Sequence, residues 1–169
     1  MPSFRTIKTS KTLKIDLQPS TSRPLQGGQS KNLFKELILP VKKNESARRL
    51  LLCINAVLQK KAKNIVVLNV KETSSFTDYL LICSGATDRQ VQAVSDAIQE
   101  YLKKEDIRPL GVEGKTNAEW ILLDYDDVVI SVFQESARSF YGLEDLWDAP
   151  RMKIDENAAE IKKLTKDMA

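Results

Sequence analysis

The sequence predicts an α/β domain with a single mixed β-sheet and flanking helices. Two short runs, 65–70 and 79–83, are apolar and rich in β-branched residues, which is typical of strands buried on both faces. Two longer stretches, 47–58 and 88–104, repeat apolar residues at helical spacing. A later segment, 110–133, holds short apolar runs separated by polar breaks, as in a β-hairpin. The order helix, strand, strand, helix, strand, strand, strand, helix gives the fold class, with the two buried strands at the centre of the sheet.

Length and composition fit one domain with additional chain at its ends. The 169 residues are 42% hydrophobic, which is enough for one core. Residues 1–43 are rich in Pro, Gly, Ser and Thr and sustain no period, so we expect a disordered extension. No apolar run reaches the roughly 18 residues that a membrane span needs.

Charge is divided unevenly along the chain. Residues 1–49 carry eleven basic and three acidic side chains, so the rest of the chain is net acidic although the whole carries +3. Three interpretations of the basic extension fit: a mitochondrial or plastid transit peptide, an arm that contacts RNA or an acidic surface, and a solubilising segment.

The first helix is expected to begin between Asn44 and Ser46, and its apolar stripe ends at Leu58. Lysines follow this stripe, where cations suit a helix C-terminus. After the second strand, Thr87 and Gln90 have the spacing of a capping box, so the second helix runs from about 88 to 104.

The remaining elements are shorter. A strand over 110–112 precedes a hairpin of strands 119–125 and 128–133, joined at the pair Asp126-Asp127 because Asp favours turns. Ser136 is expected to cap a short helix over 137–142. From Arg151 the residues are charged, and 151–169 are predicted to form a C-terminal tail with a loose helix.

Trp120 begins the first hairpin strand in strongly acidic surroundings. Between Leu110 and Asp148 nine residues are acidic and two are basic. Such a surface attracts a basic protein and repels a phosphate backbone, so we expect no sequence-specific contact with nucleic acid. Two interpretations of Trp120 fit: a core aromatic, and an interface anchor at a strand edge.

The absence of histidine narrows the possible chemistry. It excludes Ser-His-Asp and Cys-His nucleophile pairs and histidine-ligated metals. Cys53 and Cys83 lie in apolar patterns and are expected as buried free thiols. The turn at Gly85 lacks the spacing of a phosphate-binding loop, and Asp78 is more typical of a solvated or capping residue than of a ligand. We therefore expect no enzymatic activity, cofactor or metal.

Six segments of the chain together form a specific pattern. They are Thr77-Asp78-Tyr79, Ile82-Cys83-Ser84-Gly85, Arg89-Gln90-Val91, Pro109-Leu110-Gly111-Val112-Glu113-Gly114, Trp120-Ile121-Leu122-Leu123-Asp124-Tyr125 and Phe140-Tyr141-x-Leu143-Glu144-x-Leu146-Trp147. This pattern resembles the ribosomal silencing factor family, also called Iojap-like. The resemblance covers about 47–150 in one register. We therefore expect a family domain over 44–150, with 1–43 and 151–169 outside it.

The resemblance implies a nucleotidyltransferase-like fold without the catalytic carboxylates. It also implies binding to the large ribosomal subunit through a basic protein of the intersubunit face, ribosomal protein L-fourteen. Bound there, family members obstruct joining of the small subunit and repress translation under nutrient limitation. The resemblance implies a cytoplasmic protein, or a mitochondrial or plastid one if the extension is a transit peptide. Organellar relatives act in large-subunit assembly, so the resemblance also leaves that role open.

Combined with the acidic hairpin, the resemblance predicts a set of partner-binding residues. They are Glu113, Glu119, Trp120, Ile121, Leu122, Asp124, Tyr141 and Trp147. The sequence departs from the family at Gln90 and Ser131, where many members carry histidine. Two other classes stay open: a nucleotide-binding transferase that uses the Gly85 turn and Asp78, and a homodimerisation module.

Overall fold

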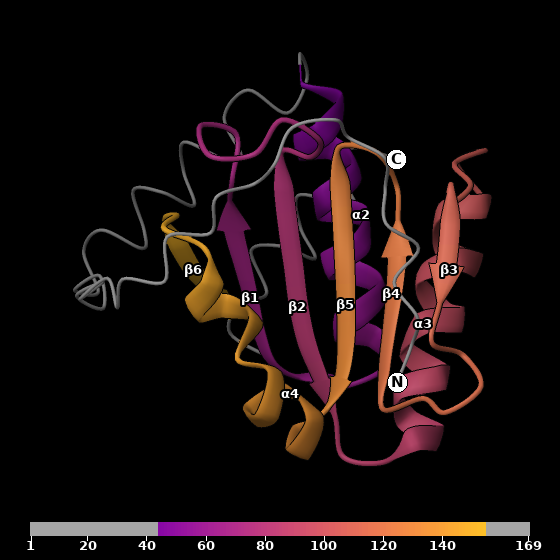
Figure 1. The fold of residues 1–169 in the computed structure, drawn as a ribbon. Helices are drawn as coiled ribbons and strands as arrows, with labels where there is room; N and C mark the ends of the chain where they lie inside the picture. Colours follow the sequence, from indigo (N-terminus) through magenta and orange to yellow (C-terminus); the bar gives the residue numbers. More distant parts are fainter. Residues whose placement is uncertain (1–43, 155–169) are drawn as a thin grey trace.

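The computed structural model describes residues 44–154, which form one mixed six-stranded sheet in the order β3-β4-β5-β2-β1-β6 (Figure 1). The predicted α/β fold with a single mixed sheet is confirmed. The predictions for residues 1–43 and 155–169 lie outside the described residues. Within 44–154, no helix is both long and apolar enough to cross a membrane.

The elements follow the predicted order as far as α4, and two unpredicted elements, a 3-10 turn and a sixth strand, come after it. The helices are α2 (Glu45–Gln59), α3 (Asp88–Lys103) and α4 (Glu135–Tyr141), and the 3-10 turn η1 covers Leu143–Leu146. The strands are β1 (Lys63–Asn69), β2 (Tyr79–Gly85), β3 (Gly111–Glu113), β4 (Trp120–Asp124), β5 (Val128–Gln134) and β6 (Arg151–Ile154).

Side-chain caps define where the two long helices begin. The Asn44 side chain accepts a hydrogen bond from the Ala47 amide (3.3 Å) and thereby caps α2. In α3 the Thr87 hydroxyl accepts from the Gln90 amide (3.1 Å), as predicted. The Gln90 side chain in turn accepts from the Ala86 amide (2.8 Å), so the capping pair satisfies backbone donors on both sides of Thr87.

The two central strands of the sheet are β5 and β2, whereas the sequence predicted β1 and β2 at the centre. β2 is buried along its whole length and pairs in parallel with β5, while β1 lies on the other side of β2, second from the edge. The other strand pairs are antiparallel. Parallel pairing of β2 with β5 requires a crossover, which is provided by the connection that contains α3.

Two local predictions are wrong. α4 begins at Glu135 directly after β5, so Ser136 lies inside its first turn, and the N-cap Gln134 makes no side-chain capping bond. The predicted tail also begins too early, because Arg151–Ile154 forms the edge strand β6, antiparallel to β1. The Asn69 amide donates to the Pro150 carbonyl (3.1 Å) at the start of this pairing.

Gly114 begins the six-residue connection between β3 and β4, and its carbonyl accepts from the Ala118 amide (3.1 Å). Its φ of +81° lies in the region that favours glycine. A Cβ atom at this position would lie 1.9 Å from the Trp120 carbonyl oxygen. This close approach of two backbones determines how β4 and its first residue, Trp120, enter the sheet.

Candidate partner-binding face

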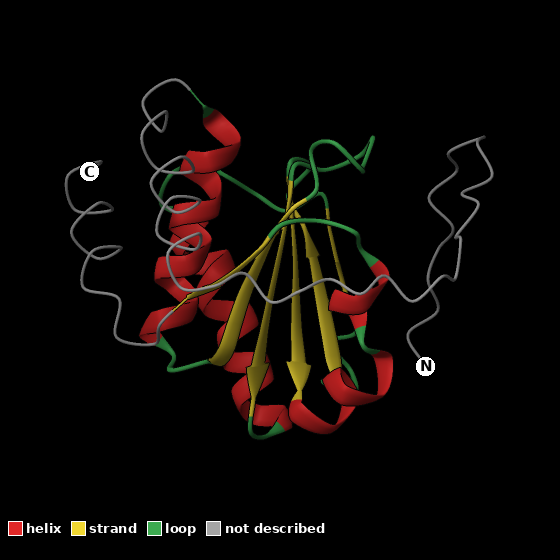
Figure 2. Cartoon of the chain, turned by 90° about the vertical axis from the view of Figure 1, so that its left-hand side faces the viewer, coloured by secondary structure: helices red, strands yellow, loops and turns green. Residues whose placement is uncertain are grey.

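The two faces of the sheet are covered very differently. Figure 2 shows the long helices α2 and α3 on one side and the short helices α4 and η1 on the other. Under α2 and α3 lies the larger core, which includes Leu50, Ile54, Leu81 and Ile130. The opposite face holds a smaller cluster, against which residues of α4, η1 and the chain before β6 pack, and on this side Leu122 and Val129 are only partly buried.

Strand register places a gradient of side-chain type across this second face. Paired residues on neighbouring strands share a face, so rows can be read directly from the register. One row runs Glu113, Leu122, Ser131, Ile82, Val66, Lys153. The next runs Gly111, Asp124, Val129, Leu80, Leu68, Arg151. Acids therefore lie toward the β3 edge, apolar residues in the middle and cations at the β6 edge.

The middle of these rows is only partly covered. Ile82 and Leu68 are fully buried, whereas Leu122 and Val129 are half-buried. Leu122 and Val129, with the acids Glu113 and Asp124 beside them in the rows, form what we call the open face. It is an apolar centre of two side chains with a carboxylate next to each.

The structure corrects the expected position of Trp120. Its side chain is 8% exposed and packs in the smaller cluster. Its ring stacks on Phe133 (centroids 4.7 Å apart) and lies against Tyr141 (5.0 Å). In the sheet Trp120 pairs with Phe133 of β5, whereas β3 pairs with Leu122–Asp124 farther along the same strand. It supports the open face from within and does not act as an exposed anchor.

A second predicted contact residue, Ile121, is also buried. Side chains alternate between faces along a strand, so Ile121 points under the helices, where it is 0% exposed. Contact between its side chain and a partner is therefore excluded in this conformation. Glu119, just before β4, and Glu113 are exposed, and Asp124 is half-buried with its carboxylate accepting from the Asp126 amide (2.8 Å).

Aromatic side chains at the rim of the smaller cluster lie on the same side of the sheet as the open face. Tyr141 and Trp147 are half-buried and pack against the smaller cluster, so part of each ring stays exposed. Trp147 meets Phe76, from the loop before β2, edge to face (6.1 Å, 61°). Phe76 is 43% exposed. Phe76 and Val129 were not among the predicted contact residues; for Phe76 the available signal was an aromatic residue in an otherwise polar loop.

An ion pair between Arg138 of α4 and Glu144 of η1 fixes the path of the chain through these two short helices. The Arg138 guanidinium donates to Glu144 (Nε to Oε1, 2.8 Å), to the Ser84 hydroxyl (2.8 Å) and to the Asn64 carbonyl (2.6 Å). Both charged side chains are largely buried, so the pair holds α4 and η1 against β1 and β2.

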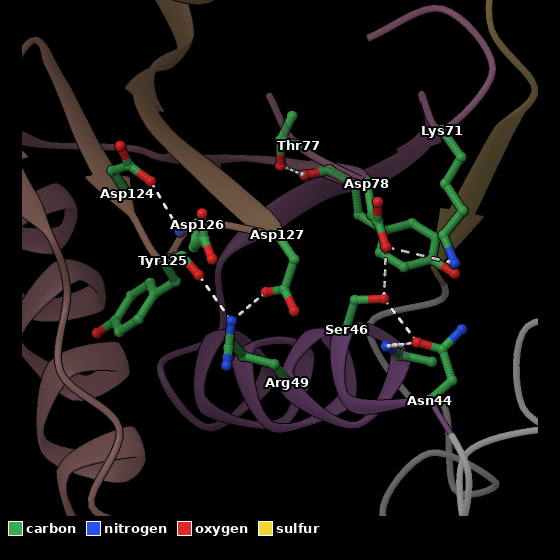
Figure 3. Close-up of polar contacts among 12 residues, drawn as sticks. Asn44, Ser46, Arg49, Lys71, Thr77, Asp78, Asp124, Tyr125, Asp126 and Asp127 are labelled. Carbon is green, nitrogen blue, oxygen red and sulfur yellow. Dashed lines mark hydrogen bonds and ion pairs between the residues drawn. The ribbon is translucent and has the colours of Figure 1, made fainter. Parts of the chain in front are cut away.

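The tip of the β4–β5 hairpin is occupied by structural contacts (Figure 3). Arg49 of α2 donates to the Tyr125 carbonyl (2.8 Å) and pairs with the Asp127 carboxylate. Burial raises the pKa of Asp127, although the neighbouring Arg49 acts in the opposite direction. These contacts tie the hairpin tip to the start of α2.

Asp78, considered above as a ligand, also has protein partners. It accepts from the Ser46 hydroxyl (2.7 Å) and lies 3.5 Å from the Lys71 ammonium (Figure 3). Across residues 44–154, no three His, Cys, Asp or Glu side chains are grouped to hold a metal ion. Cys53 and Cys83 are buried free thiols, as predicted.

The two positions that depart from the family resemblance have defined surroundings. Gln90 donates to the carbonyls of Lys60 and Lys61 (3.3 and 3.2 Å) and so joins the start of α3 to the end of α2. Ser131 is 3% exposed and lies between Leu122 and Ile82 in its row.

Comparison with known proteins gives a consistent result. The family model described as ribosomal silencing factor during starvation matches residues 43–169. Ribosomal silencing factors RsfS of Halalkalibacterium halodurans and Bacillus subtilis are 40% and 41% identical over 105 and 97 residues, covering 62% and 57% of this chain and 90% and 82% of theirs. A mouse protein named for mitochondrial assembly of the ribosomal large subunit is 28% identical, over 64% of this chain and 48% of that protein. The chloroplastic Iojap protein of Zea mays is 31% identical, over 52% of this chain and 38% of that protein.

Solved structures support the same relationship. A crystal structure from Bacillus halodurans has a TM-score of 0.55 at 38% identity and covers 63% of this chain and 95% of its own. One from Chromobacterium violaceum has a TM-score of 0.58 at 29% identity, over 66% and 94%. With a family model that matches most of the chain and relatives that it spans almost end to end, this protein belongs to the ribosomal silencing factor family.

Proposed function

We propose that this protein binds the large ribosomal subunit, blocks its association with the small subunit and thereby represses translation under nutrient limitation. The open face is the proposed contact surface. Its partner would be a basic protein on the intersubunit face, and the family resemblance indicates ribosomal protein L-fourteen. The bacterial relatives favour action in the cytoplasm.

The observation that carries this proposal is the half-exposed pair Leu122 and Val129, each with an acid beside it in the sheet. The apolar pair provides area that gains free energy when covered. The exposed Glu113 and Glu119 and the partly exposed Asp124 favour a cationic partner over RNA. Tyr141, Trp147 and Phe76 add aromatic area at the rim, the residue type most often found at interface hot spots.

Steric exclusion is sufficient as a mechanism. A folded domain bound at the joining surface occupies volume that the small subunit needs, so no turnover is required. The carboxylates at the hairpin tip and Asp78 serve ion pairs and hydrogen bonds of the fold, which favours a binding protein over a transferase. Exposed acids accelerate association, and because charge screening acts over about 8 Å at physiological salt, this acceleration weakens as salt rises.

Charge-matched variants test the contact surface. Leu122→Lys places a cation at the centre of the open face, whereas Leu110→Lys places one at a 73% exposed position just before β3. We expect Leu122→Lys to weaken cosedimentation with large subunits at least tenfold, and to restore subunit joining measured by light scattering. Leu110→Lys should behave like the parent. If both folded variants bind and inhibit like the parent, the open face is not the contact surface.

A second candidate function, large-subunit assembly in an organelle, is favoured by the mitochondrial and chloroplastic relatives. It uses the same contact surface at an earlier stage. Sedimentation of cell extracts distinguishes the two: an assembly factor is found on immature large particles, and a silencing factor on mature large subunits. A homodimer through the open face would instead show a concentration-dependent mass that Leu122→Lys abolishes.

A further inference from the structure

Four cations gather at the end of the sheet opposite the β4–β5 hairpin tip. Lys60 and Lys61 follow α2, Lys63 begins β1 and Arg89 lies in the first turn of α3. In Figure 1 this is the lower end of β1 and β2, away from the turn that joins β4 to β5. We call these four residues the basic end.

The cations of the basic end are available to a ligand. All four side chains are exposed. None makes an ion pair within the described part of the chain, whereas Arg48, Arg49, Arg138 and Arg151 each pair with an acid. The sequence holds no acidic residue from 46 to 71, so Asp88 is the one acid adjacent in sequence to any of the four.

The backbone holds the basic end in place. The Gln90 side chain donates to the carbonyls of Lys60 and Lys61, which fixes the turn after α2 to the residue that follows Arg89. Lys63 lies opposite Ser84 in the β1–β2 ladder. Two segments that are distant in the sequence, 60–63 and 84–90, are therefore joined, and the backbone positions that carry the four cations are set before any ligand binds.

A second group of exposed cations, at the far end of α3, differs from the basic end in its neighbouring charges. Lys103, Lys104 and Arg108 are also exposed, at the far end of α3. Glu105 and Asp106 lie between them, so that region has little net positive charge. Charge along the sequence, together with exposure, distinguishes the basic end, and at the same end of the sheet Glu135 follows the Gly85–Gln134 pair as an exposed acid.

We propose that the basic end binds the phosphate backbone of RNA without reading its sequence. Lysine is a compact cation that contacts phosphate as a point charge, and several such contacts give affinity that depends on salt and not on base identity. The acidic open face repels phosphates, so the two surfaces would orient the protein, with the basic end toward RNA and the open face toward a basic protein. That this RNA belongs to the large ribosomal subunit rests on the function proposed above.

The test measures binding of the full chain to a short fluorescent RNA duplex by anisotropy, over a series of salt concentrations. The variant changes Lys60, Lys61 and Lys63 to Gln, and the control changes Lys103, Lys104 and Arg108 to Gln, with the same loss of charge. Both keep the basic extension 1–43, so any contribution of that segment is equal.

We expect the Lys60, Lys61, Lys63 variant to reduce the slope of log affinity against log salt by about 2, since each lost phosphate contact contributes about 0.7–0.9. The control should change the slope by less than one contact. An equal loss in both variants, or no loss in either, would overturn the proposal. So would binding to phosphatidylserine vesicles that depends on the three lysines while duplex binding does not.

The two proposals fail separately. Leu122→Lys and Leu110→Lys carry equal charge and should bind the RNA duplex equally, even though the first loses large subunits. If RNA binding proves independent of the basic end while Leu122→Lys still loses large subunits, the RNA proposal fails and the proposed function stands. The opposite pattern would retain the RNA surface and remove the open face.

Discussion

Replacing Trp120 with Ala is expected to destabilise the fold strongly, because the ring is a core residue. It is 8% exposed, stacks on Phe133 (4.7 Å, 26° between planes) and lies against the tilted ring of Tyr141 (5.0 Å, 50°). Truncation of a buried Trp or Phe to Ala costs about 3–5 kcal/mol, which includes the lost aromatic pairs of about 0.5–1.5 kcal/mol each. Since small domains have a total stability of about 5–15 kcal/mol, this is a large fraction.

The assay is urea denaturation followed by far-ultraviolet circular dichroism, because the variant lacks one of two tryptophans and fluorescence would change for that reason alone. Leu122→Ala is the comparison. It lies two residues along the same strand and the same face but is half-buried, so we expect a loss of about 1 kcal/mol. A clearly larger loss for Trp120→Ala than for Leu122→Ala is the result expected for a buried ring.

One result would refute this reasoning. If Trp120→Ala unfolds within about 1 kcal/mol of the parent, yet loses binding to large subunits, the side chain is an exposed anchor and its packing against Phe133 and Tyr141 is wrong. A protein that is destabilised, and that binds normally at low temperature where it is folded, would confirm the supporting role.

Two further predictions concern the turn after β3 and the inner face of the sheet. Gly114→Ala should lower stability by at least about 2 kcal/mol, because φ is +81° and the new Cβ would meet the Trp120 carbonyl oxygen at 1.9 Å. Gly111→Ala, with no atom within 4 Å of its Cβ, should stay within about 0.5 kcal/mol, and equal urea midpoints for the two would contradict the turn conformation. Burial raises the pKa of the Cys83 thiol to about 12 from an ordinary 9.0, so near pH 8 the folded protein should hold about a thousandfold less Cys83 thiolate and react slowly with a thiol reagent until urea unfolds it. Rapid labelling of the folded protein would show that this region opens.

The long elements were predictable because their signals are local. The apolar stripe of α2 and the Thr87–Gln90 capping box of α3 are complete within a few residues, and both helices end close to the expected positions. The apolar runs of β1 and β2 are similarly self-contained. Each of these segments carries its own evidence, independent of the rest of the fold.

The parts that were missed depend on distant contacts. β6 has four residues with alternating charged and apolar side chains, and it becomes a strand because β1 lies beside it, more than eighty residues earlier in the sequence. The burial of Trp120 depends on Phe133 and Tyr141, which the register and the position of α4 bring to it. The polar residues next to Trp120 in the sequence gave no indication that Phe133 and Tyr141 cover it. Ile121 was also expected at the surface, but the alternation of side chains along β4 points it into the larger core.

The late position of β6 in the sequence has a consequence for synthesis of the chain. Proteins are made from the N-terminus, and β1 exposes an unpaired edge of apolar, β-branched residues until β6 emerges. Once added, β6 presents Arg151 and Lys153 on an outermost strand of four residues, and short, charged edge strands discourage pairing with another chain. A nascent chain stalled before residue 151 would therefore be prone to aggregation in a way that the finished domain is not.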